Sequence, residues 1–359
     1  MNCFYSIQDF LNSPLSTLIN AKLSFSNLGK LNEQEFSSLC SALSNCQQLS
    51  NLVIFLCEEK IGDQDVQSLV LALSKCSQLQ IFDLTLIKCQ ITEQGAKELA
   101  HYFRSNNGLQ SLKINLQKNE IGGQGAIDLV SAVAECKNLQ DLSIDLFQNK
   151  IEIKDASDLG KSFSKCFYLQ KLNLNLNVNN IGLKCLSDLF MGLGICTNIK
   201  QISLQLQSNF LGGFNENTFL GLEQCIKLQS LQIDLCHNEI HDADAKILGN
   251  SLAKINSLTK LQLLIGKCNI GAQGLVVLGS QLPQLNNFYS LKISLKEDSI
   301  SLQNILDFIS SLKECPRLST FCLFKIPNQL NSSEFDIIRM EIMRKINKFK
   351  RLVEKKIKV

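Results

Sequence analysis

The sequence predicts an α/β solenoid, in which a short strand and a helix alternate along the chain and stack into a parallel sheet covered by helices. Two observations predict this fold. Apolar anchors recur at a nearly constant interval, and the apolar spacing inside each interval changes once, from two residues to about 3.6. The anchors are Leu49, Leu79, Leu109, Leu139, Leu169, Ile199, Leu228, Leu258, Phe288 and Leu318. Every step between them is 30 residues except one of 29.

Within the interval that begins at Leu109, the strand comes first. Leu112 and Leu116 belong to a run in which apolar and polar residues alternate, as in a strand with one buried face. Ala126 and Val130 follow at helical spacing. Strands stack roughly 4.8 Å apart and helices need more room, so the sheet is expected on the concave side and the helices on the convex side. The sequence thus predicts a horseshoe of about 10–11 repeats of ~30 residues.

Two further sets of residues, one of asparagines and one of cysteines, recur at a constant position in the repeat. We expect the asparagines to form hydrogen bonds with the backbone of neighbouring turns, and the cysteines to be buried thiols of the core. The asparagine row comprises Asn119, Asn149, Asn179, Asn209 and Asn238, with Cys89 and Cys268 at the same phase. The cysteine row comprises Cys46, Cys76, Cys136, Cys166, Cys196, Cys225 and Cys315.

Composition fits one folded array with a basic end. Apolar residues make up 45% of the 359 residues and charged residues 19%, which excludes a disordered chain. The net charge is only +3, yet residues 334–359 hold nine Lys and Arg against four Asp and Glu. We therefore divide the chain into an N-terminal cap (1–17), the solenoid (18–331) and a C-terminal basic amphipathic helix (332–359).

The cysteine content indicates a reducing compartment. The chain has 15 cysteines and does not begin with a basic segment followed by an apolar run, so a secretory signal is not expected. No run of 18 apolar residues suggests a membrane span. We expect a cytoplasmic protein, with cytoskeletal or ciliary assemblies as candidate locations, and not a secreted one.

The repeat resembles the leucine-rich-repeat superfamily, in particular its ribonuclease-inhibitor-like subtype. The matching pattern, L-x-L-x-x-N-x-I-G-x-x-G-A-x-x-L, runs from Ile114 to Leu129, and the resemblance covers nearly the whole chain. It implies a horseshoe of parallel strands and helices. The subtype includes ribonuclease inhibitors, Ran GTPase-activating proteins and sensor halves of innate immune receptors. The usual unit of this subtype has nearer 28 residues. The two residues added here preserve the alternation of inward-facing and outward-facing side chains in the strand.

The solvent-facing strand positions form the first candidate binding surface. Its central part is rich in amides, and Phe55, Ile87 and Phe147 are apolar anchors, with Phe147 expected to be exposed. The alternative is a solvated sheet face whose polar residues only keep the protein soluble. The candidate contact residues are Phe55, Ile87, Asn115, Asp145, Phe147, Asn175, Gln205 and Asp234.

The basic tail is the second candidate surface. Its apolar residues follow helical spacing, so its first half is expected to cover the open core of the last repeat. The second half is expected to project toward an acidic protein, nucleic acid or lipid headgroups, with a protein preferred. The candidate contact residues are Arg344, Lys345, Lys348, Arg351 and Lys355.

Signals for chemistry are poor. Cys236, His237, His241 and Asp242 suggest metal ligands, but the repeat phase places them across a strand end and a turn, and we interpret the histidines as ordinary surface residues. GGQG at 122–125 is a repeat turn, and no phosphate-binding or dinucleotide-binding motif occurs. We expect no catalytic residue, metal or cofactor.

These observations favour a non-enzymatic protein–protein interaction scaffold that is a component of a larger assembly. Its partners are one or more proteins of unknown identity, with no small-molecule substrate and no homo-oligomer expected. One alternative, implied by the resemblance, is a GTPase-activating protein like the Ran regulators, although the acidic tail of many of those proteins is basic here. Another is an RNA- or membrane-associated adaptor that uses the tail.

Overall fold

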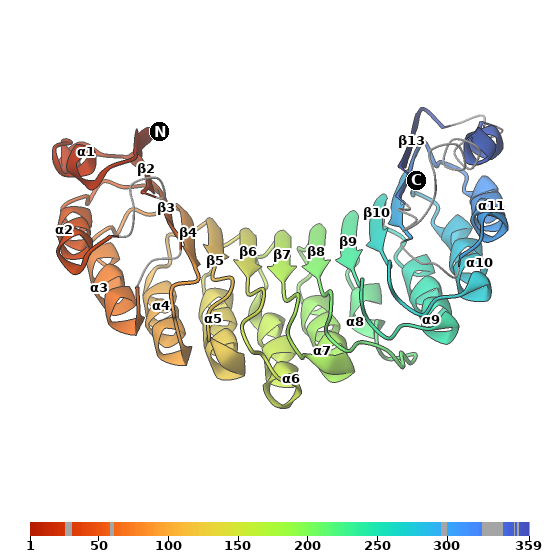
Figure 1. The fold of residues 1–359 in the computed structure, drawn as a ribbon, viewed down its shortest axis with the longest axis horizontal. Helices are drawn as coiled ribbons and strands as arrows, with labels where there is room; N and C mark the ends of the chain where they lie inside the picture. Colours follow the sequence, from red (N-terminus) through yellow and green to blue (C-terminus); the bar gives the residue numbers. More distant parts are fainter. Residues whose placement is uncertain are drawn as a thin grey trace. The chain divides into compact units, whose positions relative to one another are not determined.

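The computed structural model describes residues 1–25, 31–57, 61–295, 300–324, 340–347, 349 and 352–358. It divides into two compact units, Met1–Asn179 (unit 1) and Asn180–Val359 (unit 2). Both units repeat a strand and a helix, so that the strands form one layer and the helices the other (Figure 1). This is the α/β solenoid that the sequence predicts.

Unit 1 contains parallel strands that pair in chain order. Its strands are β1 (Asn2–Phe4), β2 (Asn20–Ser24), β3 (Asn51–Cys57), β4 (Ile81–Ile87), β5 (Ser111–Asn115), β6 (Asp141–Asp145) and β7 (Lys171–Asn175). Its helices are α1 (Ile7–Leu11), α2 (Glu33–Ser44), α3 (Asp63–Leu73), α4 (Glu93–Ser105), α5 (Gly122–Ala134) and α6 (Ile153–Ser162). The segment predicted as a cap thus supplies the short strand β1 and helix α1 at one end of this sheet.

Unit 2 is built in the same way. Its strands are β8 (Gln201–Gln205), β9 (Ser230–Asp234), β10 (Lys260–Leu264), β11 (Ser290–Ser294), β12 (Thr320–Phe324) and β13 (Glu354–Lys358). Its helices are α7 (Gly182–Gly194), α8 (Leu220–Glu223), α9 (Asp242–Ala253), α10 (Ala272–Gln281) and α11 (Leu302–Ser311). Helix α8 is much shorter than its neighbours, a difference that the repeat pattern did not predict.

The register of the strands fixes which side chains are buried. Ile54 lies opposite Leu84, and Leu84 lies opposite Ile114, so successive strands are offset by 30 residues and equivalent residues stand in rows. These three side chains are fully buried. Because alternate strand residues point to opposite faces, the residues between them form a second set of rows on the face away from the helices.

The asparagine row holds the turns of neighbouring repeats together. Asn119 Nδ2 donates to the Leu86 and Leu116 carbonyls at 2.7 and 2.9 Å. Its Oδ1 accepts from the backbone N–H groups of Cys89 and Ile91 at 2.9 and 3.1 Å. Asn149, Asn179 and Asn238 make equivalent contacts. The prediction for these four is confirmed, and loss of one such side chain should cost about 1–3 kcal/mol, because buried backbone groups lose their partners.

The cysteine row is buried where each helix returns to the next strand, as the sequence predicts. The Cys76 thiol donates to the Leu43 carbonyl at 3.4 Å, and the Cys136 thiol donates to the Phe103 carbonyl at 3.3 Å. Burial raises the pKa of Cys76 and of Cys136 from 9.0 to about 11. These thiols are therefore protonated core groups at neutral pH.

The C-terminal segment differs from the helix predicted over 332–359. Residues 340–346 are helical, and Ile342 and Ile346 are buried. Residues 354–358, however, form β13, which pairs in parallel with β12. The predicted projecting second half of the helix is therefore wrong, because the free edge of β12 offers this segment backbone hydrogen bonds as a strand. Lys355 belongs to β13, while Lys348 and Arg351 lie outside the described residues.

Candidate functional site

We define the open sheet face as the strand side chains that alternate with the buried ones and lie on the side away from the helices. In unit 1, Phe55, Asn115 and Asp145 take these positions with intermediate exposure, and Ile87 does so at the end of β4. Asn175 has the same phase but is only 8% exposed. In unit 2, Gln205 and Asp234 end strands β8 and β9 with intermediate exposure.

Asparagine and aspartate on this face have a structural role that the sequence analysis missed. The side-chain Oδ1 of Asn115 accepts from the backbone N–H of Gln117 at 3.1 Å, and Asn175 accepts from Asn177 at 3.0 Å. In unit 2, Asp234 accepts from Cys236 at 3.0 Å. Such bonds two residues along the chain favour a turn over further strand. The amide-rich row therefore helps to end the strands as well as facing solvent.

Asp145 is the centre of a polar network in unit 1. Its Oδ2 accepts from Gln117 Nε2 at 2.6 Å and from Asn175 Nδ2 at 3.0 Å. Its Oδ1 accepts from the backbone N–H of Phe147 at 3.0 Å. One carboxylate thus connects the ends of β5, β6 and β7. A network with this many bonds holds its side chains in one arrangement before any partner binds.

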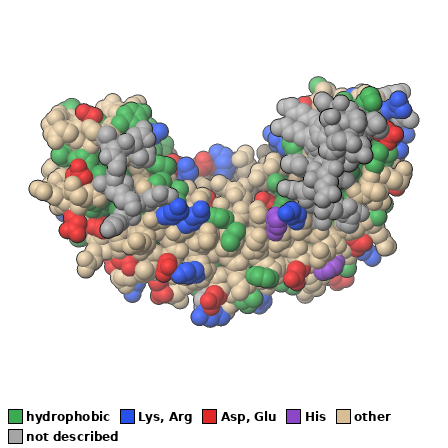
Figure 2. Space-filling view, viewed as in Figure 1, with side chains coloured by type: hydrophobic (Ala, Val, Ile, Leu, Met, Phe, Trp, Pro, Cys, Tyr) green, Lys and Arg blue, Asp and Glu red, His purple; other side chains and the backbone are tan. Residues whose placement is uncertain are grey.

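Phe147 lies in the turn after β6 rather than within a strand, and its side chain is half-buried rather than exposed as predicted. Lys118 Nζ lies 5.8 Å from the centre of the Phe147 ring, a cation–π distance. The next turn carries Val178, whose side chain is 40% exposed. On part of the unit 1 surface in Figure 2, basic side chains in blue lie next to hydrophobic ones in green. The turns therefore add apolar and basic groups to the open sheet face.

Val178 also has an unusual backbone. Its φ is 55°, in the left-handed region that favours glycine, and Lys88, Lys118 and Gln148 have similar values at the same repeat phase. A β-branched residue is least suited to this conformation. The sequence analysis missed Val178 because it considered strand rows only. The signal was an apolar residue directly before the asparagine row, where the other repeats have mostly polar residues.

A second apolar group lies where β3 and β4 are longer than the other strands. Phe55 stands opposite Thr85, and Cys57 stands opposite Ile87. Phe55, Cys57 and Ile87 have intermediate exposure, and Thr85 is buried. The structure therefore brings the predicted anchors Phe55 and Ile87 onto neighbouring strands, while Phe147 belongs to the turn after β6.

The histidine and cysteine cluster of the sequence does not form a metal site in the described part of the chain. Among the described residues, no group of three or more His, Cys, Asp or Glu side chains is arranged to hold a metal ion. Asp244 of this region instead accepts from the backbone N–H of His241 at 2.8 Å and from that of Phe214. Burial first, and then the neighbouring Asp234 charge, raise the pKa of the Cys236 thiol above its ordinary value of 9.0. Neither feature favours metal or thiolate chemistry here.

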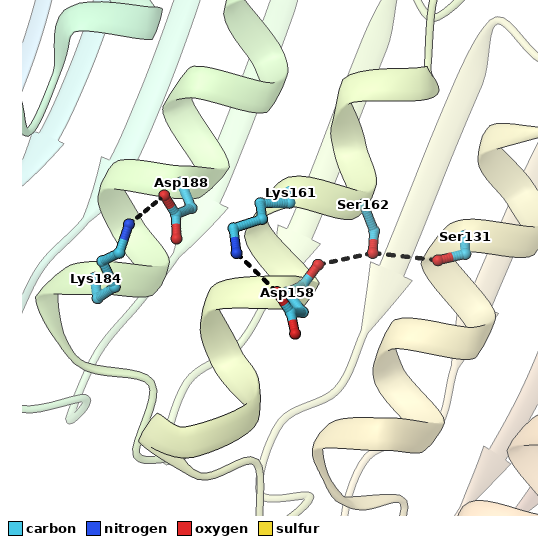
Figure 3. A network of polar contacts seen from close by, with 6 residues as sticks. All are labelled: Ser131, Asp158, Lys161, Ser162, Lys184 and Asp188. Carbon is cyan, nitrogen blue, oxygen red and sulfur yellow. Dashed lines mark hydrogen bonds and ion pairs between the residues drawn. The ribbon is translucent and has the colours of Figure 1, made fainter.

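The helix side carries local polar pairs. In unit 1, Lys161 pairs with Asp158 at 2.8 Å, and the Ser162 and Ser131 hydroxyls lie 3.2 Å apart (Figure 3). In unit 2, Lys184 pairs with Asp188 at 2.8 Å within α7 (Figure 3). Local pairs of this kind, each with an exposed lysine, contribute little to stability and do not mark a ligand site.

The tail residues are divided between two elements. Arg344 is exposed and Lys345 partly exposed in the helical stretch 340–346. Lys355 Nζ donates to Asn347 Oδ1 at 3.0 Å, so this lysine contacts the end of that stretch. The described tail therefore does not present one continuous basic helical face.

Among the described residues, no helix has the length and apolar character that crossing a bilayer requires. No protein-family model and no curated protein sequence matches this chain.

Proposed function

We propose that this chain is a non-enzymatic protein-binding scaffold of the leucine-rich-repeat class, similar to the ribonuclease-inhibitor-like subtype, and that its main contact surface is the open sheet face of unit 1. The observation that carries the proposal is the setting of Phe147. Its half-exposed ring lies under Lys118, and its backbone is held by Asp145. Binding energy in protein interfaces concentrates in such aromatic anchors, particularly when they are already held in place.

Val178 supports the same surface. A valine with φ near 55° is strained, and backbone strain is concentrated at functional sites. Its exposed side chain adds apolar area in the turn that follows β7, beyond the reach of the buried core. A partner that contacts the Val178 side chain would account for a valine at this strained position.

The number and burial of the cysteine thiols support the proposal of an intracellular location. None of the 15 cysteines, all of which lie in the described part of the chain, forms a disulfide, and most are buried. Buried thiols in this number are typical of a reducing compartment such as the cytoplasm, where the scaffold would assemble with its partners.

The test is affinity purification of the full chain from cells that express it, followed by quantitative mass spectrometry. The wild type and Phe147→Asp are compared with Tyr168→Asp, a control at an exposed aromatic outside the open sheet face. We expect a stoichiometric partner with the wild type and the control, and its loss with Phe147→Asp. Phe147→Ala, with thermal unfolding of each variant, separates lost binding from lost folding. An unchanged set of recovered proteins for both Phe147 variants would contradict the proposal.

A further inference from the structure

The helix side of unit 2 contains a groove next to the short helix α8. The neighbouring helices α7 and α9 have 13 and 12 residues, whereas α8 has four. The segment before α8 forms one wall of the groove, which has a volume of about 410 Å³. Its floor is one face of α9, with residues at helical positions i, i+3, i+4 and i+7, namely Ile247, Asn250, Ser251 and Lys254.

Internal hydrogen bonds hold both walls of the groove in place. One wall carries Glu216, and close to it the buried Asp244 carboxylate of α9 accepts from the Phe214 backbone N–H. The other wall carries Gln281 and Gln284, and Gln284 Nε2 donates to Gln281 Oε1 at 2.7 Å. The groove is therefore formed before any ligand enters, which lowers the entropic cost of binding.

Two polar side chains on the floor have no partner in the protein. Ser251 is only 3% exposed, and its hydroxyl makes no hydrogen bond with any described residue. Asn250 is partly exposed, and within the same part of the chain its carboxamide makes no hydrogen bond either. Because most buried polar side chains in proteins are hydrogen-bonded, the buried Ser251 hydroxyl indicates a ligand that bonds to it.

The charges around the groove favour a basic ligand. Lys254 Nζ donates to both carboxylate oxygens of Glu223 at 3.1 Å, so its charge is balanced within the protein. Glu216 is exposed and takes part in no ion pair with a described residue. The charge that remains unbalanced is therefore negative, and it attracts a cationic group.

We propose that this groove binds an extended peptide segment of a partner protein, with a basic residue beside Glu216. A carboxamide both donates and accepts, as a peptide unit does, so Asn250 and the two glutamines can pair with a peptide backbone. The floor from Ile247 to Lys254 is about 10 Å long, a distance that an extended chain covers in about three residues. Ile247 supplies an apolar contact for one side chain of that segment.

Other classes of ligand fit the groove less well. Among the described residues, no aromatic side chain lines it, so neither a nucleobase nor the apolar face of a sugar has a ring on which to stack. An anion such as phosphate would meet the Glu216 carboxylate and a lysine that Glu223 already binds. The polar lining also disfavours an apolar ligand, because such a ligand would leave Ser251 and Asn250 without partners.

The test is an NMR titration of the isotope-labelled full chain with a short peptide, blocked at both ends, in which leucine and lysine are flanked by glycines. The comparison probes are the same peptide with glutamate in place of lysine, maltose and inorganic phosphate. We expect the lysine peptide to shift the side-chain amide resonances of Asn250, Gln281 and Gln284. The glutamate peptide should bind roughly threefold or more weakly, and maltose and phosphate should leave these resonances unchanged.

Variants of the floor and the wall test the individual contacts. Asn250→Ala and Ser251→Ala should each weaken binding of the lysine peptide roughly threefold or more, because each removes a hydrogen bond. Alanine suits the interior of a helix, and thermal unfolding checks that both variants fold. Glu216→Gln should abolish the preference for the lysine peptide. The control is Gln303→Ala, at an exposed carboxamide on α11 outside the groove, which should bind like the wild type.

Four results would overturn the inference: no shifts with the lysine peptide, unchanged affinity in both floor variants, an equal loss in Gln303→Ala, or shifts caused by maltose or phosphate. The groove and the open sheet face of unit 1 are separate surfaces. Phe147→Asp should therefore leave peptide binding unchanged while removing the partner in the affinity purification. Failure of the groove and failure of the unit 1 surface are thus distinguishable.

Discussion

At the scale of single residues, the turns after β4, β5, β6 and β7 each place a side chain where the backbone favours glycine. The φ values of Lys88, Lys118, Gln148 and Val178 lie between 54° and 56°. Unbranched and polar residues tolerate this conformation better than valine does. Among these four positions, the strain is therefore greatest at Val178.

We predict that Val178→Gly stabilises the protein. Relief of strain of about 1–3 kcal/mol exceeds the entropy of about 0.5–1 kcal/mol that glycine adds to the unfolded chain, so the net gain is about 1 kcal/mol. Urea unfolding measures it, with Gln148→Gly as a control that should gain less. The same variant should bind the affinity-purified partner more weakly, because the exposed side chain is gone. A less stable Val178→Gly would contradict this account of the turn.

At the scale of elements, a carboxylate at the start of one helix fixes the start of the next. Asp63 begins α3, and its Oδ1 accepts from the backbone N–H groups of Thr92 and Gly95 at 2.9 and 3.0 Å. Its Oδ2 accepts from the Thr92 hydroxyl at 2.5 Å. These contacts supply partners for N–H groups that the first turn of α4 leaves without a helical acceptor.

Asp63→Ala should therefore lower the free energy of unfolding by about 1–3 kcal/mol and speed amide exchange at the beginning of α4. Hydrogen–deuterium exchange and urea unfolding measure the two effects. Asp158→Ala is the control, because the ion pair of Asp158 is with an exposed lysine of its own helix, and its loss should cost less than about 1 kcal/mol. Equal effects of the two substitutions would mean that the link between α3 and α4 contributes nothing.

Some of the elements could be predicted from the sequence, and others could not. The strand rows and the asparagine row could be predicted, because the 30-residue period determines their phase in each repeat. The strand β13 could not, because EKKIK at 354–358 follows an apolar helical spacing and becomes a strand only by pairing with β12. For Phe147 the sequence predicted neither the turn nor the contact with Lys118, because the position of Lys118 depends on backbone turns that the apolar pattern does not reveal.

At the scale of the whole molecule, the cysteine row makes stability depend on pH. Burial raises the pKa of Cys46, Cys225 and Cys315 from 9.0 to about 12, and that of Cys76 and Cys136 to about 11. The unfolded chain loses these protons near pH 9, whereas the folded chain keeps them until pH 11–12. Their contribution to stability is therefore complete below about pH 9 and is lost as the pH rises from there.

The measurement is the urea midpoint under reducing conditions at about pH 8 and about pH 10. We expect a lower midpoint at the higher pH. A variant in which Cys46, Cys76 and Cys136 are alanine should show a smaller decrease, because fewer thiols ionise on unfolding. A midpoint that is the same at both pH values, or an equal decrease in the variant, would contradict the burial of these thiols.

The central claim concerns which side of unit 1 a partner contacts. Hydroxyl-radical footprinting of the full chain, alone and with its affinity-purified partner, measures this directly. We predict that the partner protects Phe55, Ile87 and Phe147 from oxidation, while Leu71 on α3 and the exposed Tyr168 react as before. Protection of Leu71 with no change at Phe147 would place the partner on the helices and contradict the account.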